Sequence, residues 1–424
     1  MSKPTVIVSC PIDTYSGYGA RSRDFVKSLI EQNKYDVKIL PQRWGNTRKG
    51  YLKDHNDDLF TPLFIPTVNY QPDIWVQITV PNEFQKVGKY NIGVTAGIET
   101  TICDGSWLKG CNNMDLVLVS SKHAKQVFES TTFDVQDTRT GQLQGKIKLE
   151  TKVEVLFEGA DLNKYFTTTS KLDLSAISEQ FCYLSVGHWM QGDFGHDRKN
   201  IGYTIKSFLE TFKNKPNPPA LILKTQTVGT SILDRESILD RIDSIRKTVK
   251  GKLPNIYLLH GEISDEEMNW LYNHSKVKVM VSHTKGEGFG RPLLEFSLIG
   301  KPIIASGWSG HVDFLDKNYS ILLGGKLENV HPSAASKNVI LTESQWFTPD
   351  DANVNQAYRT TFKHYKKTLP NAREQKKISK ENFSYVKMKE LLGTLLDKYI
   401  PEFPSEIKLT LPKLELPKLE KIDG

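Results

Sequence analysis

The sequence predicts an α/β protein that contains two doubly wound, Rossmann-like domains, and three observations lead to this prediction. The chain has 424 residues, enough for two domains that each bury a full core. Apolar, β-branched runs with the length of buried parallel strands occur at residues 5–10, 181–187 and 277–281. Each run leads through a loop into a helical pattern, as in a Rossmann-like βαβ unit.

The first domain begins with the strand at residues 5–10, and a loop with Gly17 and Gly19 leads to a helix at 24–31. Further strands are expected at 37–40, 73–79 and 91–99. The last of these ends on Glu99, at the sheet edge where α/β proteins bind ligands. The polar, basic stretch after the second strand contains Trp44 and Tyr51 and reads as a long loop. Residues 131–152 read as a hairpin or loop insertion, and 167–180 as the linker.

The second domain is expected to continue from its first strand into a helix at 201–212 and a strand at 220–223. Arg198 and Lys199 stand directly before the helix, and Lys224 follows the strand. Their cationic groups could clamp a diphosphate, although solvated loop charges are the alternative. A strand at 255–259 and a helix that starts after Ser264 complete this half of the domain, because Ser264 and Glu267 form a capping-box pattern.

The central stretch, residues 286–314, reads as turn, helix and strand. Glycines make the turn, Pro292 suits the first turn of a helix, Gly300 ends that helix, and a strand follows at 302–305. Glu287 lies in the turn and Glu295 on the helix, with seven residues between them. One carboxylate could bind a sugar and the other a ribose hydroxyl pair. Two acids that merely flank a βα turn are the alternative.

The C-terminal part predicts amphipathic helices at 347–369 and 379–399. A tail with a repeated Leu-Pro-Lys-Leu unit follows, and its prolines predict an extended arm at 401–424.

Composition restricts the classes of protein to which the chain could belong. Fifty-six basic and 49 acidic residues give a net charge of +7, a mild bias toward acidic partners. No apolar run reaches the length of a transmembrane helix, and the start lacks the pattern of a signal peptide. Four cysteines without metal-ligand spacing favour a reducing compartment, so a cytoplasmic location is expected.

The central stretch resembles the E-x7-E signature of retaining nucleotide-sugar glycosyltransferases of the GT-B fold (glycosyltransferase family four, group 1 type). The matching residues are Glu287, Gly288, Phe289, Gly290, Pro292, Leu293, Glu295, Gly300, Pro302, Ile304 and Ala305. The resemblance covers most of residues 5–315. It implies an acceptor-side domain at 1–168, a nucleotide-sugar-binding domain at 181–380, and a helix at 381–400 that crosses back over a central cleft to the first domain.

The resemblance also implies roles for individual residues. Glu287, Glu99, Arg198 and Lys224 are the catalytic candidates. The donor-binding candidates add Gly17, Gly19, Lys199, His260, Gly261, Ile263, Gly288, Phe289, Gly290, Arg291, Pro292, Leu293 and Glu295. Acceptor-side candidates are Arg21, Arg23, Arg43, Trp44 and Glu99. A longer loop than is usual in the family leaves open which of Arg198 and Lys199 contacts the phosphates, and Glu158 stands where the family has asparagine.

The expected activity is therefore transfer of a hexose or pentose from a nucleotide-diphosphate sugar, with a UDP-sugar favoured, to an acceptor hydroxyl with retention. No cofactor and no metal are expected, since the sequence has no DxD-type triplet in a suitable loop. A carbohydrate, lipid or small-molecule acceptor is favoured over DNA.

Alternative functions stay open at this point. The basic loop at 43–53 and the basic segment at 363–389 would suit a DNA-modifying enzyme that acts on hydroxymethylated cytosine in phage DNA. The general organisation of the chain, a compact enzyme with a short repetitive tail, also resembles that of virus-encoded glycosyltransferases. A non-catalytic nucleotide-sugar-binding protein is the alternative from a different class. The hypothesis of a sugar phosphorylase is weakened, because no lysine motif for pyridoxal phosphate is recognised.

Overall fold

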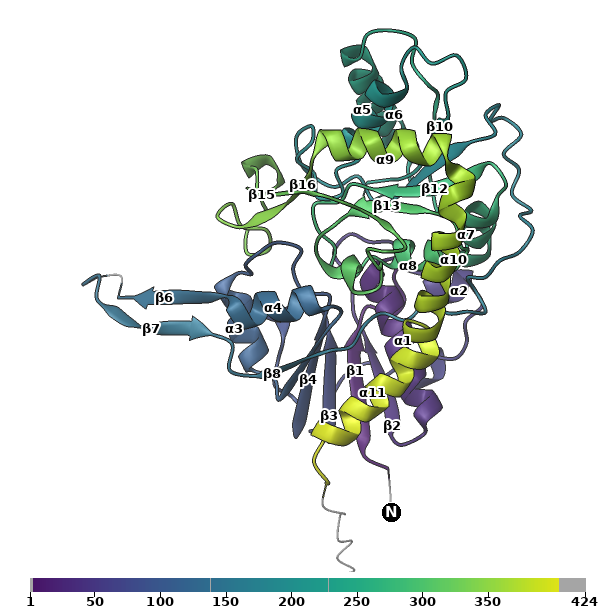
Figure 1. The fold of residues 1–424 in the computed structure, drawn as a ribbon. Coiled ribbons are helices and arrows are strands. Elements are labelled where there is room, and N and C mark those ends of the chain that lie inside the picture. The colour runs from purple at the N-terminus through teal and green to yellow at the C-terminus, as the bar shows by residue number, and fades with distance from the viewer. Residues whose placement is uncertain (1–2, 138, 228, 404–424) are drawn as a thin grey trace, which may run out of the picture.

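The computed structural model describes residues 3–137, 139–227 and 229–403, and these residues form two α/β domains (Figure 1). Each domain contains a six-stranded parallel sheet, in the order β2-β1-β3-β4-β5-β8 in the first and β11-β10-β9-β12-β13-β14 in the second. In each sheet the strand order reverses beside the first strand of the domain, which is the topological switch point of a doubly wound sheet. The predicted GT-B fold is confirmed.

The first domain contains the following elements. Its sheet strands are β1 (Thr5–Cys10), β2 (Asp36–Pro41), β3 (Ile74–Ile78), β4 (Tyr90–Thr95), β5 (Leu116–Val119) and β8 (Lys152–Val155). Its helices are α1 (Gly17–Gln32), α2 (Tyr51–Asp54), α3 (Gly105–Asn112) and α4 (Lys122–Ser130), with short 3-10 turns at Thr61–Leu63 and Pro81–Glu83.

The second domain contains a similar set. Its sheet strands are β9 (Cys182–Val186), β10 (Ala220–Lys224), β11 (Ile256–Leu259), β12 (Val277–Ser282), β13 (Ile303–Ser306) and β14 (Ile321–Leu323). Its helices are α5 (Ile201–Phe212), α6 (Ile232–Thr248), α7 (Asp265–Asn273), α8 (Arg291–Ser297), α9 (Asp351–Lys363) and α10 (Tyr365–Asn382), with 3-10 turns at Gly310–Asp313 and Pro332–Ala334. An antiparallel pair, β15 (Gly325–Asn329) and β16 (Gln345–Pro349), is added to it.

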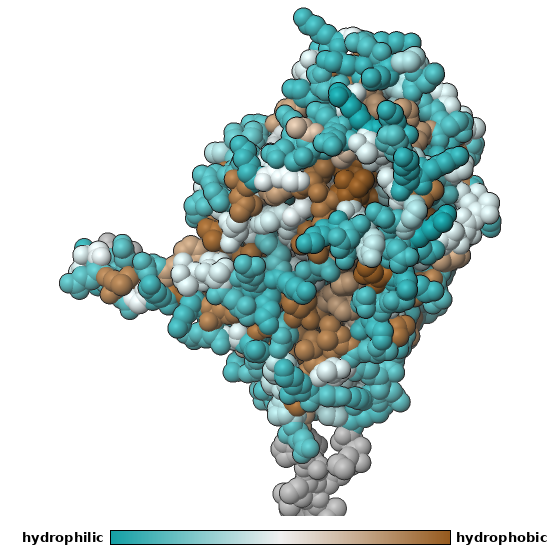
Figure 2. Space-filling view, in the orientation of Figure 1, coloured by the Kyte–Doolittle hydropathy of each residue, from teal (hydrophilic) through white to brown (hydrophobic). Residues whose placement is uncertain are grey.

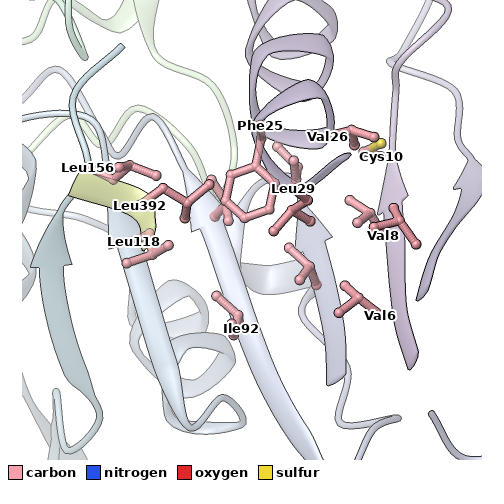
Figure 3. Close-up of a cluster of buried hydrophobic side chains, with 14 of the residues drawn as sticks. Val6, Val8, Cys10, Phe25, Val26, Leu29, Ile92, Leu118, Leu156 and Leu392 are labelled. Atoms are coloured by element: carbon pink, nitrogen blue, oxygen red, sulfur yellow. The ribbon is translucent and has the colours of Figure 1, made fainter. Parts of the chain in front are cut away.

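Helix α11 (Tyr385–Tyr399) crosses back to the first domain, as the fold prediction requires (Figure 1). Its Leu392 lies in the same buried cluster as Phe25 and Leu29 of α1 and Val8 of β1 (Figure 3). Burial of such apolar side chains contributes about 1.5–3 kcal/mol each. Helix α11 therefore belongs to the core of the first domain and packs against its first strand and first helix.

The polar stretch at 131–152 forms an antiparallel hairpin, β6 (Thr132–Gln136) and β7 (Leu143–Lys148), which projects from the body of the molecule (Figure 1). Its surface is mainly hydrophilic (Figure 2). Its base is anchored, because Phe133 and Ile147 pack against the start of α3 at Gly105.

Three of the predicted helices have different limits in the structure. Helix α1 begins at Gly17 and not at residue 24, because the side chain of Ser16 accepts a hydrogen bond from the Gly19 N–H and caps the helix. The start of the helix predicted at 347–369 is wrong, because residues 345–349 form β16 and pair with β15. The rest of that predicted helix is interrupted at His364, where α9 ends. The helix predicted at 379–399 is divided, because α10 ends at Asn382 and Ser384 caps α11.

The predicted arm at 401–424 lies, apart from residues 401–403, outside the described residues. Among the helices of residues 3–137, 139–227 and 229–403, none combines the length and the apolar character needed to cross a bilayer.

Candidate active site

The glycine turn between β12 and α8 places Glu287 at the junction of the two domains. A Cβ atom at Gly286 would lie 2.1 Å from the Glu99 carbonyl oxygen, and one at Gly288 would lie 2.8 Å from that of Ala96. Only glycine permits this approach of the turn to the loop that follows β4. Gly290 ends the turn with a φ of 99°, in the left-handed region that glycine adopts readily. The sequence therefore brings Glu287 next to Glu99.

A cluster of four charged side chains occupies the junction. Lys199 Nζ lies 2.6 and 2.7 Å from the two carboxylate oxygens of Glu287. Arg198 Nη1 lies 3.5 Å from Glu287 Oε2 and 3.1 Å from Glu99 Oε1, and donates to the Gly286 carbonyl at 2.9 Å. The predicted catalytic candidates Glu99, Arg198 and Glu287 thus meet, together with the donor-binding candidate Lys199. We call these four residues the junction cluster.

The electrostatics of the junction cluster keep Glu287 ionised. Burial opposes the charge on this carboxyl, but Lys199 and Arg198 outweigh burial and lower the pKa of Glu287 to about 2. The turn itself is fixed by the Glu287 N–H, which donates to Ser309 Oγ at 2.8 Å, and by the Gly310 N–H, which donates to the Glu287 carbonyl at 2.9 Å. Ser309, in the loop after β13, thus helps to fix the position of Glu287.

Lys224 lies at the end of β10 and is held by the loop after β11. Its Nζ donates to the Gly261 carbonyl at 2.6 Å, and burial lowers its pKa. In the same loop His260 Nε2 lies 2.7 Å from Asp234 Oδ2. Among the described residues Lys224 forms no ion pair with Glu287. It therefore stands one strand away from the junction cluster, beside the predicted donor-binding residues His260, Gly261 and Ile263.

Arg291 and Glu295 form a second charged group on α8. Arg291 Nη1 lies 2.6 Å from Asp24 Oδ2 of α1 and 3.6 Å from Glu158 Oε2, and its Nε lies 3.7 Å from Glu295 Oε1. The Tyr272 hydroxyl donates to Glu295 Oε2 at 3.4 Å. Burial raises the pKa of Glu295 to about 8 against the opposing effect of Arg291. Glu295 is thus mostly protonated at neutral pH, while Arg291 links the second domain to the first.

Substitution Glu295→Gln should raise the free energy of unfolding near pH 9 and leave it nearly unchanged near pH 4, below both pKa values. The folded-state pKa of about 8 lies above the ordinary value of 4.5, so the unfolded chain loses this proton first as the pH rises. Stability is therefore lost between those two values, by at most about 1.4 kcal/mol per pH unit. Glutamine cannot lose a proton in this pH range, so the variant does not show this loss of stability as the pH rises.

Urea unfolding at both pH values measures this effect, with Glu266→Gln, an exposed acid on α7, as the matched control. Equal pH dependence of unfolding in wild type and Glu295→Gln would contradict the assignment.

The first-domain candidates lie in and around α1. Gly17 and Gly19 occupy its first turn, and a Cβ atom at Gly19 would lie 2.3 Å from the Thr14 carbonyl oxygen. Arg21 is 4% exposed and donates to the Leu156 and Phe157 carbonyls. Arg23 donates to the Ile12 and Thr14 carbonyls and lies 3.4 Å over the Tyr51 ring. The contacts of both arginines are structural, so their acceptor-side role stays a prediction.

A pocket of about 670 Å³ lies where the carboxyl ends of β9 and β10 face the first domain. We call it the donor pocket, because Glu262 of the predicted donor-binding loop 260–263 lines it. Its walls include Tyr15, Trp44 and Arg48 from the first domain and His188 and Gln226 from the second. Its volume suits a drug-sized ligand such as a nucleotide.

The donor pocket adds residues that the sequence did not single out. Gln226 is buried, and its Nε2 donates to Glu262 Oε1 at 2.7 Å within the pocket wall. A Cβ atom at Gly187, next to His188, would lie 3.5 Å from the Lys199 side chain, so the junction cluster adjoins this pocket. Trp189, Asp234 and Arg241 also line it.

Within residues 3–137, 139–227 and 229–403, no group of three or more His, Cys, Asp or Glu side chains is placed to hold a metal ion.

Two parallel doubly wound sheets, a charged junction between them and a returning C-terminal helix define the chain as a GT-B protein. Solved structures with this fold cover nearly the whole chain. A glycosyltransferase from Rickettsia africae is 13% identical, with a TM-score of 0.63, over 94% of this chain and 99% of its own. Sucrose-phosphate synthase from Thermosynechococcus elongatus is 12% identical, with a TM-score of 0.60, over 93% and 98%.

HepE from Anabaena, solved in complex with UDP-glucose, is 14% identical with a TM-score of 0.57, over 93% of this chain and 100% of its own. The sequence matches no protein-family model and no curated protein. At these identities the comparisons establish the fold.

Proposed function

We propose that the protein is a glycosyltransferase that moves a sugar from a nucleotide-diphosphate sugar, with a UDP-sugar favoured, to an acceptor hydroxyl. The junction cluster carries this proposal, because two cations and two carboxylates meet beside the donor pocket at the boundary of two Rossmann-like domains. The structural similarity to HepE in complex with UDP-glucose supports the choice of donor.

The charge pairs suggest how the donor engages the site. Without a ligand, Glu287 and Glu99 neutralise Lys199 and Arg198. A bound diphosphate offers these cations a new anionic partner, which leaves the Glu287 carboxylate to accept hydrogen bonds from the hydroxyls of the sugar. Lys224 supplies a further cation at the neighbouring strand end. Glu295 and Arg291, on the helix after the turn, are the candidates for the ribose end of the donor.

The reaction then follows from the position of the charges. The bond from the anomeric carbon to the phosphate oxygen breaks, and the negative charge that develops on the diphosphate is stabilised by Arg198, Lys199 and Lys224. The acceptor oxygen forms the new bond on the same face, and its proton passes to the leaving diphosphate. This course retains the configuration at the anomeric carbon and assigns the neutralisation of charge to side chains, so the proposed activity is independent of metal.

The proposal is tested by mass spectrometry of the products after incubation with a panel of nucleotide sugars, each with and without an acceptor and with and without a chelator. We expect release of the nucleoside diphosphate from one donor and transfer of its sugar, at a rate that the chelator does not change. Tight binding of a nucleotide sugar without turnover would favour the alternative of a non-catalytic binding protein. Inhibition by the chelator that added metal reverses would overturn metal independence.

A further inference from the structure

A second pocket, of about 460 Å³, lies wholly within the first domain. It spans the carboxyl ends of β1, β2 and β3, which are neighbours in the sheet, and we call it the edge pocket. This is the edge at which open α/β sheets bind ligands, and the volume is within the range of small-molecule sites. Trp44 lines both the edge pocket and the donor pocket, so the two pockets adjoin at this residue.

Trp44 is held as a fixed platform. Its ring stacks on Tyr18 of α1, with ring centroids 3.9 Å apart and an angle of 22° between the planes. The Tyr18 hydroxyl is 2.9 Å from Thr95 Oγ1 and accepts a hydrogen bond from the Ala96 N–H at 3.1 Å. Ala96 is the residue against which Gly288, next to Glu287, packs. Trp44 is held by this stacking and is only partly buried, so it is able to stack on a ligand close to the glycine turn.

The polar groups of the edge pocket carry little net charge. Gln77 is fixed at both ends, since its Nε2 donates to the Glu83 carbonyl and its Oε1 accepts from the Gln85 N–H, each at 2.9 Å. The Thr79 hydroxyl donates to the Glu83 carboxylate. Arg43 is the one cation and Glu83 the one anion among the residues that line the pocket, and amides and hydroxyls make up the rest of the polar lining.

We propose that the edge pocket is the acceptor site and that the acceptor is a neutral saccharide. A sugar ring presents C–H groups on one face, which pack on an aromatic ring, and hydroxyls around its rim, which pair with amide, hydroxyl and carboxylate groups. Duplex DNA would instead require several phosphate contacts from Lys and Arg, and this lining offers one cation. The inference rests on the proposed function, because it names the acceptor of the same enzyme.

The test uses the full chain in two arms. First, calorimetry with UDP and release of UDP from the nucleotide sugar measure the donor site without an acceptor. Second, transfer is measured to neutral mono- to tetrasaccharides and to duplex DNA with and without hydroxymethylated cytosine, across a salt series. Gln42→Ala/Arg43→Ala should raise the KM for the saccharide about tenfold, and Trp44→Ala should lower kcat/KM for it by at least as much.

Lys53→Ala is the matched control, because this exposed lysine of the same basic loop lies outside both pockets. It should leave saccharide transfer unchanged, whereas a DNA acceptor would make transfer depend on its charge and on salt. A donor that binds and turns over while no neutral saccharide accepts sugar would overturn the acceptor inference and leave the proposed function standing. An unchanged KM for the saccharide in the Gln42→Ala/Arg43→Ala variant would also overturn the acceptor inference and leave the proposed function standing. Absence of both UDP binding and UDP release would overturn the proposed function, and the acceptor inference with it.

Discussion

Replacing Arg198 and Lys199 together with alanine should lower kcat by about two to three orders of magnitude. These two cations face Glu287 and Glu99 at the junction, and in the proposed reaction they stabilise the charge that develops on the diphosphate. Removal of a single group that stabilises such a charge typically costs about 10²–10³ in rate. Steady-state kinetics with a saturating donor measures the effect.

The same variant should also be less stable, and this separates the two roles of the cations. Glu287 would stay buried without its partners, at a cost of about 3–5 kcal/mol. Adding Glu287→Gln removes that unpaired charge, so the triple variant should recover stability but not turnover. Lys247→Ala/Lys250→Ala, which removes two exposed charges from the same domain, is the matched control and should keep normal kinetics. A near-normal kcat in the folded triple variant would place the diphosphate elsewhere.

Glu287→Gln alone should lower kcat about a hundredfold while the donor still binds. Gln keeps the size of the side chain, but it lacks the charge that pairs with Lys199 and the second acceptor oxygen that a sugar hydroxyl would use. Because Lys199 and Arg198 outweigh burial and hold the pKa of Glu287 at about 2, its ionisation should not shape the rate profile between about pH 5 and pH 9.

The contribution of Glu287 to folding has the opposite pH sense to that of Glu295. Its folded-state pKa lies below the ordinary value of 4.5, so the stability that it adds is complete above that value and is lost as the pH falls toward 2. Kinetics across pH for wild type and variant test the assignment. A limb of the wild-type rate profile near pH 6 that disappears in Glu287→Gln would show that this carboxyl titrates during catalysis.

The junction cluster could be predicted from the sequence because its parts follow local patterns. Glu287 lies in a glycine turn after β12, and Arg198 and Lys199 directly precede α5, which follows β9. These two strands are neighbours in the sheet, so loops at their carboxyl ends meet. Glu99 follows β4 in the first domain, at the edge that faces the same junction.

The chemistry of Glu295 could not be predicted in this way. Its protonation depends on deep burial and on carboxylates such as Asp24, which lies in another domain and far away in the sequence. The donor pocket was missed for a similar reason, since residues such as Trp189 and Gln226 come from loops that have no regular spacing. The end of β16 was predicted as the start of a helix, because Phe347 is an apolar residue that fits either period.

The acceptor-side predictions show the same division between local and long-range information. Trp44 was predicted from its place in a basic, aromatic loop, and it lines both pockets. Arg21 was predicted from its charge and its place beside the first glycine-rich loop, whereas the structure buries it against the Leu156 and Phe157 carbonyls. A charge in a sequence indicates which ligand could be bound, but the tertiary contacts determine whether the side chain is free to bind it.

Calorimetric titration of UDP and UMP into the wild-type protein tests whether a nucleoside diphosphate binds across the donor pocket with its phosphates on the junction cluster and Lys224. We expect UDP to bind at least about tenfold more tightly than UMP, since charge-assisted contacts to the second phosphate contribute about 1.5–3 kcal/mol. In the folded variant Arg198→Ala/Lys199→Ala/Glu287→Gln this preference should shrink, because only Lys224 of the three cations remains. Equal affinities of UDP and UMP for the wild-type protein, or an undiminished preference for UDP in that folded variant, would contradict this placement of the diphosphate.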